Sequence, residues 1–311
     1  MRTAHPAGGP YYLVFKTRNL YIILKGAEGV PILTTAFHQS GETINCPGPS
    51  ASIVRAPHQT WLAFWDTSRS IYVNARHKNV HYRLIAQEIA GYLSSPTARV
   101  LDYGSGEALH ADIVAAAAGQ VLLCDAAPLV RASVAARFAN NLKVRAVAPE
   151  EVERLPQQSL DLIVLHSVAQ YLMPNETRAL FALFRRLLNT NGVLVVSDVM
   201  APDIRAITDA LALLRFAAAN GFLAAAFAGL VRMRLSKYWR VRMTLGLACY
   251  GEAAMIKELA AAGFSVRRAP QNIGHNKARM TFIARSREAQ SDVVRRGRLP
   301  RNIQGSWPPT V

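Results

Sequence analysis

A glycine-containing turn and an aspartate further along the chain have the residue types and spacing needed to bind a nucleoside-containing cofactor. The turn is Asp102-Tyr103-Gly104-Ser105-Gly106, and Asp125 follows nineteen residues beyond Gly106. Glycines let the backbone turn sharply and let a ligand approach the main chain. An acidic side chain at the later position can accept hydrogen bonds from both hydroxyls of a ribose. The pattern therefore indicates a cofactor that contains adenosine.

Two residues of this pattern distinguish between the candidate cofactors. The third glycine of the dinucleotide-binding fingerprint, which lets the helix pack closely on a pyrophosphate, would fall at Leu109. Asp102 would repel a pyrophosphate, but it suits a cofactor that carries an ammonium group and a sulfonium. The residues thus favour S-adenosylmethionine. Two alternatives stay open, namely a nicotinamide-dependent oxidoreductase and a non-catalytic, cofactor-binding regulatory protein.

Alternating strand and helix patterns surround these residues. Apolar runs predict strands over residues 99–103, 120–124, 142–147, 160–165, 193–199, 264–269 and 280–285. Helical spacing predicts helices over residues 81–93, 108–118, 129–139, 176–188 and 252–262, the last of them closed by Gly263. A turn is expected at Asn191-Gly192. Such alternation predicts an α/β fold with a mostly parallel sheet covered on both faces.

The segment from Val100 to about Arg285 resembles the class I S-adenosylmethionine-dependent methyltransferases, of the broad small-molecule kind called type 11. The resemblance lies in VLDYGSGEAL, VLLCDAAP, LPQQSLDLIVLHSVAQYL, LFRRLLNTNGVLVVSDVM, GFSVRR and RMTFIARS, in that order. It implies a doubly wound, Rossmann-like fold whose seven-stranded sheet has an antiparallel last strand. It also implies an enzyme that uses S-adenosylmethionine as its cofactor.

The same resemblance implies roles for individual residues. Asp102, Gly104 and Gly106 would surround the methionine part of the cofactor, and Asp125 would hold the ribose. Glu150 or Glu151 would lie near the adenine amino group, with Glu151 slightly favoured. His166 and Ser167 would face the cofactor and the substrate. Arg76, in a segment that folds over the cofactor in related enzymes, could pair with the methionine carboxylate.

Two histidines are the candidates for catalytic residues. His166 ends an apolar strand at the carboxyl edge of the predicted sheet, where α/β sites form. His275 lies in the loop before the last strand, which should open on the same face. The alternative for His166 is a structural histidine bonded to the backbone, and the alternative for His275 is an ordinary loop residue. Asp198, at the end of another strand, could touch either the substrate or a helix N-terminus.

Residues 201–250 form a hydrophobic, largely helical insert, which we expect to close the acceptor pocket as a lid and to select a partly apolar small molecule. Its large apolar residues are Phe216, Phe222, Phe227, Met233, Tyr238, Trp239 and Met243. Extra packing, a dimer face and a membrane contact are the alternatives. Its uncharged run, residues 216–231, is shorter than the ~20 residues that a spanning helix needs.

Composition limits the remaining possibilities. Hydrophobic residues make up 51% of the 311 residues, so a substantial core can form. The net charge of +16 is spread along the chain without basic runs interleaved with aromatics, so a nucleic-acid partner is not expected. The three cysteines lack disulfide or zinc spacing, which fits a cytoplasmic protein without a metal. We expect a poorly ordered extension over residues 1–60, the methyltransferase domain over 61–286, and a disordered basic tail over 287–311.

Overall fold

The computed structural model describes residues 11–17, 20–26, 32–34, 61–62, 64–66, 71–204, 206–234 and 246–287. The chain divides into two compact units, residues 1–44 and 45–311. In the first unit, β1 (Tyr11–Thr17), β2 (Leu20–Gly26) and β3 (Ile32–Thr34) form an antiparallel sheet in that order. The predicted extension contains these strands. Its other residues up to 60, and residues 288–311 of the predicted tail, lie outside the described residues.

The second unit contains a seven-stranded sheet with the order β6-β5-β4-β7-β8-β10-β9. Its strands are β4 (Arg99–Tyr103), β5 (Gln120–Cys124), β6 (Val144–Val147), β7 (Leu160–His166), β8 (Leu188–Val199), β9 (Phe264–Arg268) and β10 (Met280–Ser286). Its helices, in chain order, are α2 (Ala75–Ala90), α3 (Ala111–Ala117), α4 (Pro128–Arg137), α5 (Pro149–Glu153), the 3-10 turn η1 (Ala169–Tyr171), α6 (Pro174–Leu187), α7 (Ala206–Ala219), α8 (Leu223–Arg234) and α10 (Glu252–Ala261).

Pairing within this sheet confirms the predicted topology. Strands β4 to β8 pair in parallel, whereas β10 runs antiparallel to both β8 and β9. Gly263 turns the chain from α10 into β9 with a φ of +90°, a conformation that glycine adopts without strain. The fold is therefore α/β and doubly wound, with an antiparallel last strand in an otherwise parallel sheet.

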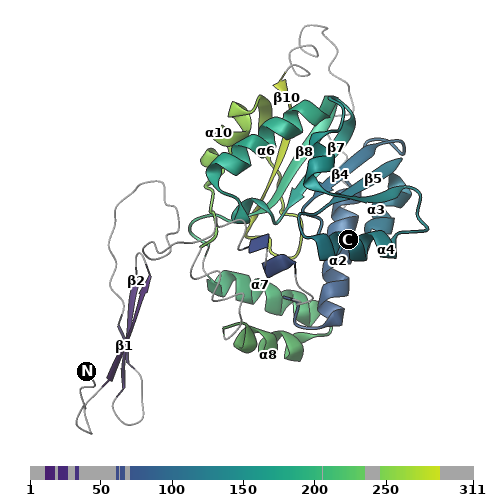
Figure 1. The fold of residues 1–311 in the computed structure, drawn as a ribbon. Helices are drawn as coiled ribbons and strands as arrows, with labels where there is room; N and C mark the ends of the chain where they lie inside the picture. The colour runs from purple at the N-terminus through teal and green to yellow at the C-terminus, as the bar shows by residue number, and fades with distance from the viewer. Residues whose placement is uncertain are drawn as a thin grey trace, which may run out of the picture. The chain divides into compact units, whose positions relative to one another are not determined.

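Helices cover both faces of the sheet because successive strand residues point to opposite sides (Figure 1). Leu101 packs on the side of α6 and α10 with Phe181, Phe184 and Met255. Its neighbour Val100 packs on the other side, in a cluster formed with residues of α2, α3 and α4. A core of this kind holds the strand ends in fixed positions.

The order of strands reverses between β4 and β7. From β4 the chain proceeds outward through β5 and β6, and it then returns to β7 on the opposite side of β4. Ligands of open α/β sheets bind beyond the carboxyl ends of the strands at such a reversal. This edge, which carries the loop after β4 and the residues after β7, is where we place the candidate site.

Several predicted boundaries shift in the structure. Helix α2 begins at Ala75 instead of His81, because the Asn74 side chain caps it by accepting the N–H of His77 at 2.8 Å. Helix α3 begins later than predicted, since Ala108 has a φ of +43°, which is incompatible with a right-handed helix. Asn191-Gly192, expected as a turn, lies within β8, where the pairing with β7 shifts between Leu188 and Val193.

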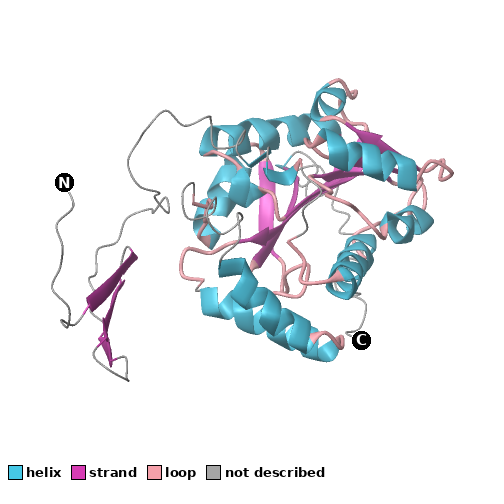
Figure 2. Cartoon of the chain, turned by 60° about the horizontal axis from the view of Figure 1, so that its bottom comes forward, coloured by secondary structure: helices cyan, strands magenta, loops and turns pink. Residues whose placement is uncertain are grey.

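The insert after β8 forms the helix pair α7–α8, which lies beyond the carboxyl edge of the sheet (Figures 1 and 2). Leu213, Ala217, Phe222 and Ala226 form its buried cluster and pack against the segment that starts α2. A Cβ on Gly229 would lie 2.3 Å from Cγ1 of Val73, so the two backbones approach closely. Tyr238, Trp239 and Met243 of the predicted lid lie outside the described residues. Within the described residues, no helix combines the length and apolarity needed to cross a bilayer.

Candidate active site

The loop after β4 turns sharply because two glycines adopt left-handed conformations, with a φ of +79° at Gly104 and +57° at Gly106. A Cβ on Gly104 would lie 2.2 Å from Cγ2 of Val168, and one on Gly106 would lie 2.7 Å from the hydroxyl of Tyr82. Neither position has room for a larger residue. The sequence therefore needs glycine at both positions for conformation as well as for space.

The backbone amides of this loop are satisfied within the protein. The N–H groups of Gly104 and Ser105 both donate to the carbonyl of Cys124, at 2.7 and 3.0 Å. The next two amides, of residues 106 and 107, donate to Asp125 Oδ2 and to the Tyr82 hydroxyl, each at 3.0 Å. A phosphate-binding loop presents free N–H groups to its anion. Residues 104–107 offer none, which disfavours a dinucleotide here.

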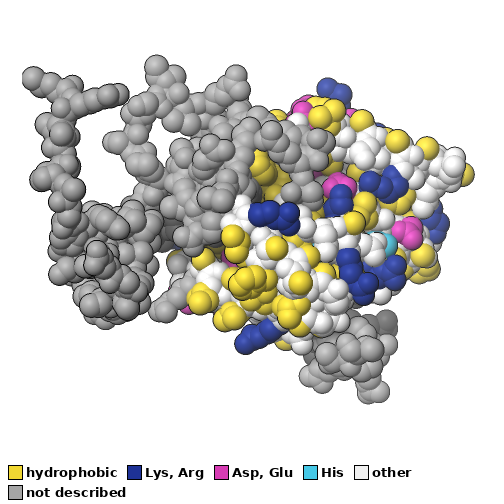
Figure 3. Space-filling model, turned by 90° about the horizontal axis from the view of Figure 1, so that it is seen from below, with side chains coloured by type: hydrophobic (Ala, Val, Ile, Leu, Met, Phe, Trp, Pro, Cys, Tyr) yellow, Lys and Arg dark blue, Asp and Glu magenta, His cyan; other side chains and the backbone are white. Residues whose placement is uncertain are grey.

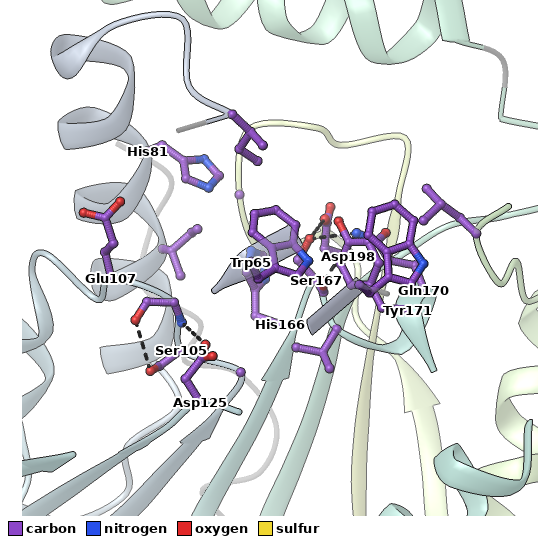
Figure 4. Close-up of a pocket in the computed structure, with 18 of the residues that line it drawn as sticks. Trp65, His81, Ser105, Glu107, Asp125, His166, Ser167, Gln170, Tyr171 and Asp198 are labelled. Carbon is purple, nitrogen blue, oxygen red and sulfur yellow. Dashed lines mark hydrogen bonds between the residues drawn. The ribbon is translucent and has the colours of Figure 1, made fainter. Parts of the chain in front are cut away.

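Asp125 follows β5, and its carboxylate lies at the cavity wall between the loop and α4 (Figure 4). Oδ2 accepts the N–H of Gly106, and Oδ1 accepts the N–H of Ala127 at 2.9 Å. Burial raises the pKa of this carboxyl, and the two amides partly oppose the shift. Each carboxylate oxygen retains capacity for one more hydrogen bond, so both could accept a hydroxyl of a ligand.

Asp102 lies deeper than the other loop residues. It borders a small separate cavity beneath the loop rather than the main cavity. Burial, followed by the negative charge of Asp125, raises the pKa of Asp102 to about 7. Its carboxyl group thus lies behind the loop, and it would act on a cofactor through the shape and charge of the loop.

The two adjacent glutamates of α5 take different positions. Glu150 lines the main cavity, as does Glu153. Glu151 does not: its side chain is 42% exposed, pairs with Arg145 at 2.5 Å, and accepts the N–H of Ala148. The hydrogen bond from Arg145 lowers the pKa of Glu151. Of the two, Glu150 is therefore the glutamate that a ligand in the main cavity could contact.

Arg76 also points away from the cavity. Its Nε donates to the carbonyl of Asn220, in the turn between α7 and α8. Lys78 supplies a cation to the cavity wall instead, with Nζ 2.8 Å from both carboxylate oxygens of Glu107. Arg76 and Lys78 differ in this way because residues two positions apart on a helix, here α2, project to different sides.

The cavity has a volume of about 1770 Å³. Pockets for a single small ligand are commonly ~300–1,000 Å³, so this one has room for a cofactor and a second molecule. Figure 4 shows Ser105, Glu107 and Asp125 at one end, and His166, Ser167, Asp198, Gln170, Tyr171 and Trp65 at the other. The second end is closed by aromatic and aliphatic side chains, namely Trp61, Trp65, Ile71, Tyr171, Leu213, Leu230 and Leu247.

Three histidines and two phenylalanines form an aromatic group beside this end. His77 stacks on Phe222 with ring centroids 5.0 Å apart, and His275 stacks on Phe216 at 4.8 Å. His81 lies 5.6 Å from His275. Burial lowers the pKa of all three, that of His77 to about 4, and the other histidines contribute to the shifts.

These histidines are therefore neutral at pH 7, and each keeps an uncommitted ring nitrogen. Among the described residues, the buried atoms His77 Nε2, His81 Nδ1 and His275 Nδ1 have no hydrogen-bond partner. A buried polar atom without a partner is costly. Nδ1 of His77 accepts the N–H of Val73 at 3.4 Å, so Nε2 of the neutral ring carries the hydrogen and would need an acceptor. All three residues line the cavity, so a ligand with polar groups could supply partners.

His166 ends β7 and also lines the cavity. Its Nδ1 lies 2.9 Å from the hydroxyl of Ser197 on β8, which fixes the orientation of the ring. Burial lowers the pKa of His166, although Asp198 and Glu88 partly oppose the shift. The tight turn at Gly274 brings the loop of His275 beside this ring, since a Cβ there would lie 3.7 Å from His166 Cε1. The structure thus brings the two predicted histidines to one end of the cavity.

A buried polar network forms the wall beside His166. Arg279 donates to Asp198 at 2.7 Å and to Asp209 of α7 at 3.2 Å, and these side chains are 14–22% exposed. The Ser167 hydroxyl donates to Asp198 Oδ2 at 2.6 Å. Burial disfavours the Arg279 cation, but the two carboxylates outweigh burial and raise its pKa. The network links β7, β8, the loop before β10 and the helix pair α7–α8.

Ser167 and Asp198 hold unusual backbone conformations in this network. Their φ values are +59° and +61°, in the left-handed region that costs non-glycine residues energy. Ser167 directly follows β7, and Asp198 is the penultimate residue of the adjacent strand β8. In this conformation the two side chains point toward each other at the cavity wall, where they form the hydrogen bond described above.

Sequence reasoning did not select Asp209, Arg279 or Gln170. Gln170 lies in η1, and its Nε2 bonds to Ser167 while its Oε1 accepts from Arg279. Arg279 is a charged residue directly before an apolar strand, which is the signal that could have drawn attention to it. Asp209 had no such signal, because it is a single carboxylate in an otherwise uncharged stretch.

The protein is thus a doubly wound α/β protein with a large cavity at the carboxyl edge of its sheet, polar at one end and partly apolar at the other. Residues 101–196 match a family model described as a methyltransferase domain. A search of curated proteins found no significant match. Residues 101–196 are therefore a methyltransferase domain, and the chain is an enzyme of that type; the mixed sheet with its antiparallel β10 agrees with this.

Solved structures with similar folds include magnesium protoporphyrin IX methyltransferase from Synechocystis PCC 6803 with bound S-adenosylmethionine. It is 16% identical, the match covers 76% of this chain and 100% of that one, and the TM-score is 0.48. The YcgJ protein of Bacillus subtilis is 16% identical over 60% of this chain and 70% of that one, with a TM-score of 0.43. Human N-acetylserotonin methyltransferase is 12% identical over 74% of this chain and 54% of that one, with a TM-score of 0.45.

Proposed function

We propose that this enzyme transfers a methyl group from S-adenosylmethionine to a small, partly apolar acceptor in the cytoplasm. The observation that carries the proposal is a single cavity that joins two different environments. One end has the glycine loop and Asp125, and the other has aromatic side chains and neutral histidines. A donor and an acceptor could therefore lie in contact, which is the main requirement of a direct transfer.

The cofactor end suits S-adenosylmethionine in its charge and its hydrogen-bonding groups. Glu107, Asp125 and Glu150 place carboxylates along it, which suits a ligand that carries an ammonium group and a sulfonium. Asp125 has lone pairs left for ribose hydroxyls. Because the backbone amides of residues 104–107 are already bonded, a pyrophosphate would find no free N–H groups among them. When bound, the cofactor supplies a methyl group on a positively charged sulfur, which is a good leaving group.

The acceptor end suits a molecule with an apolar body and a polar reacting group. Trp61, Trp65 and Tyr171 pack against one another there, with Trp61 and Tyr171 centroids 4.7 Å apart. Aromatic walls exclude water and bury flat or aliphatic surface. The polar atoms of His166 and His275 lie at this end and could bind a hydroxyl or an amine.

His166 and His275 are the candidates for receiving a proton. An acceptor hydroxyl or amine loses its proton when its oxygen or nitrogen bonds to the methyl group. Because burial keeps both pKa values low, each imidazole is neutral and able to accept that proton, and then to release it to solvent. Ser197 fixes the ring of His166, and the stack on Phe216 fixes that of His275.

Calorimetry provides the first test. The full chain should bind S-adenosylmethionine and S-adenosylhomocysteine and should not bind NAD. Glu150→Gln and Glu151→Gln form a matched pair on one helix, and only Glu150 lines the cavity. We expect E150Q to weaken S-adenosylhomocysteine binding and E151Q to leave it unchanged. Tight binding of NAD without S-adenosylhomocysteine binding would refute the proposal.

Methyl transfer provides the second test. Radiolabelled S-adenosylmethionine is supplied with fractionated small metabolites, and labelled products are counted. His166→Gln or His275→Gln should reduce kcat by about 10²–10⁴-fold if that residue takes the proton, with the S-adenosylhomocysteine affinity retained. His110→Gln is the control, because His110 bonds to Asn79 outside the cavity lining. Binding of the cofactor without transfer to any fraction would favour a regulatory protein.

A further inference from the structure

The helix pair α7–α8 has a second apolar face, which points away from the core. Of the eight large hydrophobic residues that are exposed among the described residues, five lie on this pair. They are Ile207 at 64% exposed, Leu211 at 45%, Leu223 at 48%, Phe227 at 66% and Val231 at 59%. Scattered exposed hydrophobic residues are ordinary on a protein surface, but a concentration on one element indicates a contact surface.

Helical spacing explains why this face is outside. Leu213, Ala217, Phe222 and Ala226 fill the inner side of the pair. Ile207, Leu211 and Arg215 follow one another at intervals of four along α7, and Phe227 and Val231 do so along α8. These intervals place them in stripes on the other side of each helix. The pair is therefore apolar on both sides, and we call the exposed one the outer face.

The charge of the outer face is positive. Arg215 is exposed in the stripe of Ile207 and Leu211, and Arg232, which follows Val231 in the chain, is exposed on the same helix pair. The only acidic residue between positions 206 and 234 is Asp209, and its carboxylate pairs with Arg279 in the buried network. Figure 3 shows the hydrophobic patch with basic side chains around it. An anionic surface would complement this face in both charge and apolarity.

The outer face continues into the rim of the cavity. Ile207 and Val231 line the cavity and are also well exposed, so they border its mouth. A surface that covers the outer face would consequently adjoin the opening through which an apolar molecule enters. A surface that served only to pack against another protein would not need to adjoin the mouth of the cavity.

From these observations we infer that the outer face of α7–α8 docks on an anionic phospholipid bilayer, with the helices lying in the plane of the headgroups. An amphipathic pair with Arg residues and large apolar side chains has the chemistry of such an interfacial element. A symmetric contact with a second copy would bring arginines against arginines without carboxylates. After docking, the mouth of the cavity would face the lipid phase. The acceptor would then be an amphiphile that enters the cavity from the bilayer. This last step rests on the proposed function, whereas docking itself does not.

Vesicle flotation with the full chain tests the docking. The chain should float with vesicles of equal parts phosphatidylglycerol and phosphatidylcholine, and much less with phosphatidylcholine alone or at high salt. Leu211→Ser/Phe227→Ser should lower the partition coefficient at least about tenfold. Arg215→Gln/Arg232→Gln should lower it about 25-fold, since one basic residue contributes about fivefold at an anionic surface. None of these four residues lines the cavity.

Matched control variants test whether vesicle binding depends on the outer face in particular. Leu142→Ser changes a side chain that is 99% exposed on another part of the domain. Arg154→Gln/Arg285→Gln removes two exposed charges at the opposite, amino edge of the sheet. Both controls should bind vesicles nearly as the parent does, and every variant should keep its melting temperature and its S-adenosylhomocysteine affinity.

Three results would overturn the inference. The first is the absence of flotation with anionic vesicles. The second is an equal loss in the amino-edge charge control, which would mean that net charge alone drives binding. The third is a dimer in sedimentation analysis that L211S/F227S dissociates, which would assign the outer face to a second copy. A chain that floats as expected but transfers no methyl group would refute the proposed function and leave the docking intact.

Discussion

Replacing Arg279 by leucine should destabilise the protein strongly at neutral pH. Arg279 lies between Asp198 and Asp209, and its loss would leave two largely buried carboxylates facing each other without a cation. Breaking a buried ion pair by removing one partner costs roughly 3–5 kcal/mol. For a domain of this size, such a loss lowers the melting temperature by roughly 6–20 °C.

A surface pair of equal length provides the matched control. Arg268 lies 2.7 Å from Glu252, the same distance that separates Arg279 from Asp198, but its side chain is 44% exposed and that of Glu252 is 46%. Exposed pairs contribute about 0–1 kcal/mol. Arg268→Leu should therefore shift the melting temperature by a few degrees at most, although it removes the same charge.

Thermal melts and guanidinium titrations of both variants beside the parent measure this difference. If R279L and R268L were equally stable, our account of the network would be refuted.

Three further predictions follow from the site. Gly104→Ala should reduce both stability and S-adenosylhomocysteine affinity, because the added Cβ meets Val168 at 2.2 Å and the φ is +79°; melting and calorimetry would show whether the loop tolerates it. Asp125→Asn should weaken S-adenosylhomocysteine binding by roughly 10–100-fold in calorimetry, as a charged hydrogen-bond acceptor is lost; an unchanged affinity would place the ribose elsewhere. Because the pKa of His77 is about 4 when folded and near 6.5 when unfolded, the free energy of unfolding should fall as pH decreases through that interval. His77→Phe should show a smaller decrease, and identical pH profiles would contradict the buried state of His77.

The fold could be predicted because its signals are local. Each parallel strand is a short apolar run, and the turn after Val100-Leu101-Asp102 is marked by glycines that no other residue type could replace. The number of strands and the antiparallel last strand came from the resemblance, and the structure confirms both. Boundaries were less certain where a cap or a positive φ decides them, as at Asn74 and Ala108.

The sequence did not show which of two neighbouring helical residues would face the cavity. Adjacent positions differ by about 100° around a helix, so Glu150 faces the cavity whereas Glu151 turns to Arg145. In the same way Lys78 lines the cavity whereas Arg76 does not. The chemistry predicted for these segments stays a prediction, and the structure changes which side chain would supply it.

The buried network was inaccessible to sequence reasoning because its members are far apart along the chain. Asp209 and Arg279 are separated by 70 positions, and Asp198 and Arg279 by 81. Nothing in the local pattern pairs them. The histidine group differs, since His77 and His81 are spaced by four and so share a side of α2. That spacing was visible, but it does not reveal that His275 joins them.

The bonded amides of residues 104–107 have a consequence for how a cofactor would bind. Because Cys124, Asp125 and Tyr82 already hold these N–H groups, the loop acquires its shape when the sheet folds and not when the ligand arrives. Little ordering entropy is then lost on association, which is the thermodynamic advantage of preorganisation. Hydrogen–deuterium exchange at these four amides should be slow in the free protein and nearly unaffected by S-adenosylhomocysteine. The recognition loop would then be as rigid as the core strands that flank it, and adaptation to different acceptors would be confined to the helices above it.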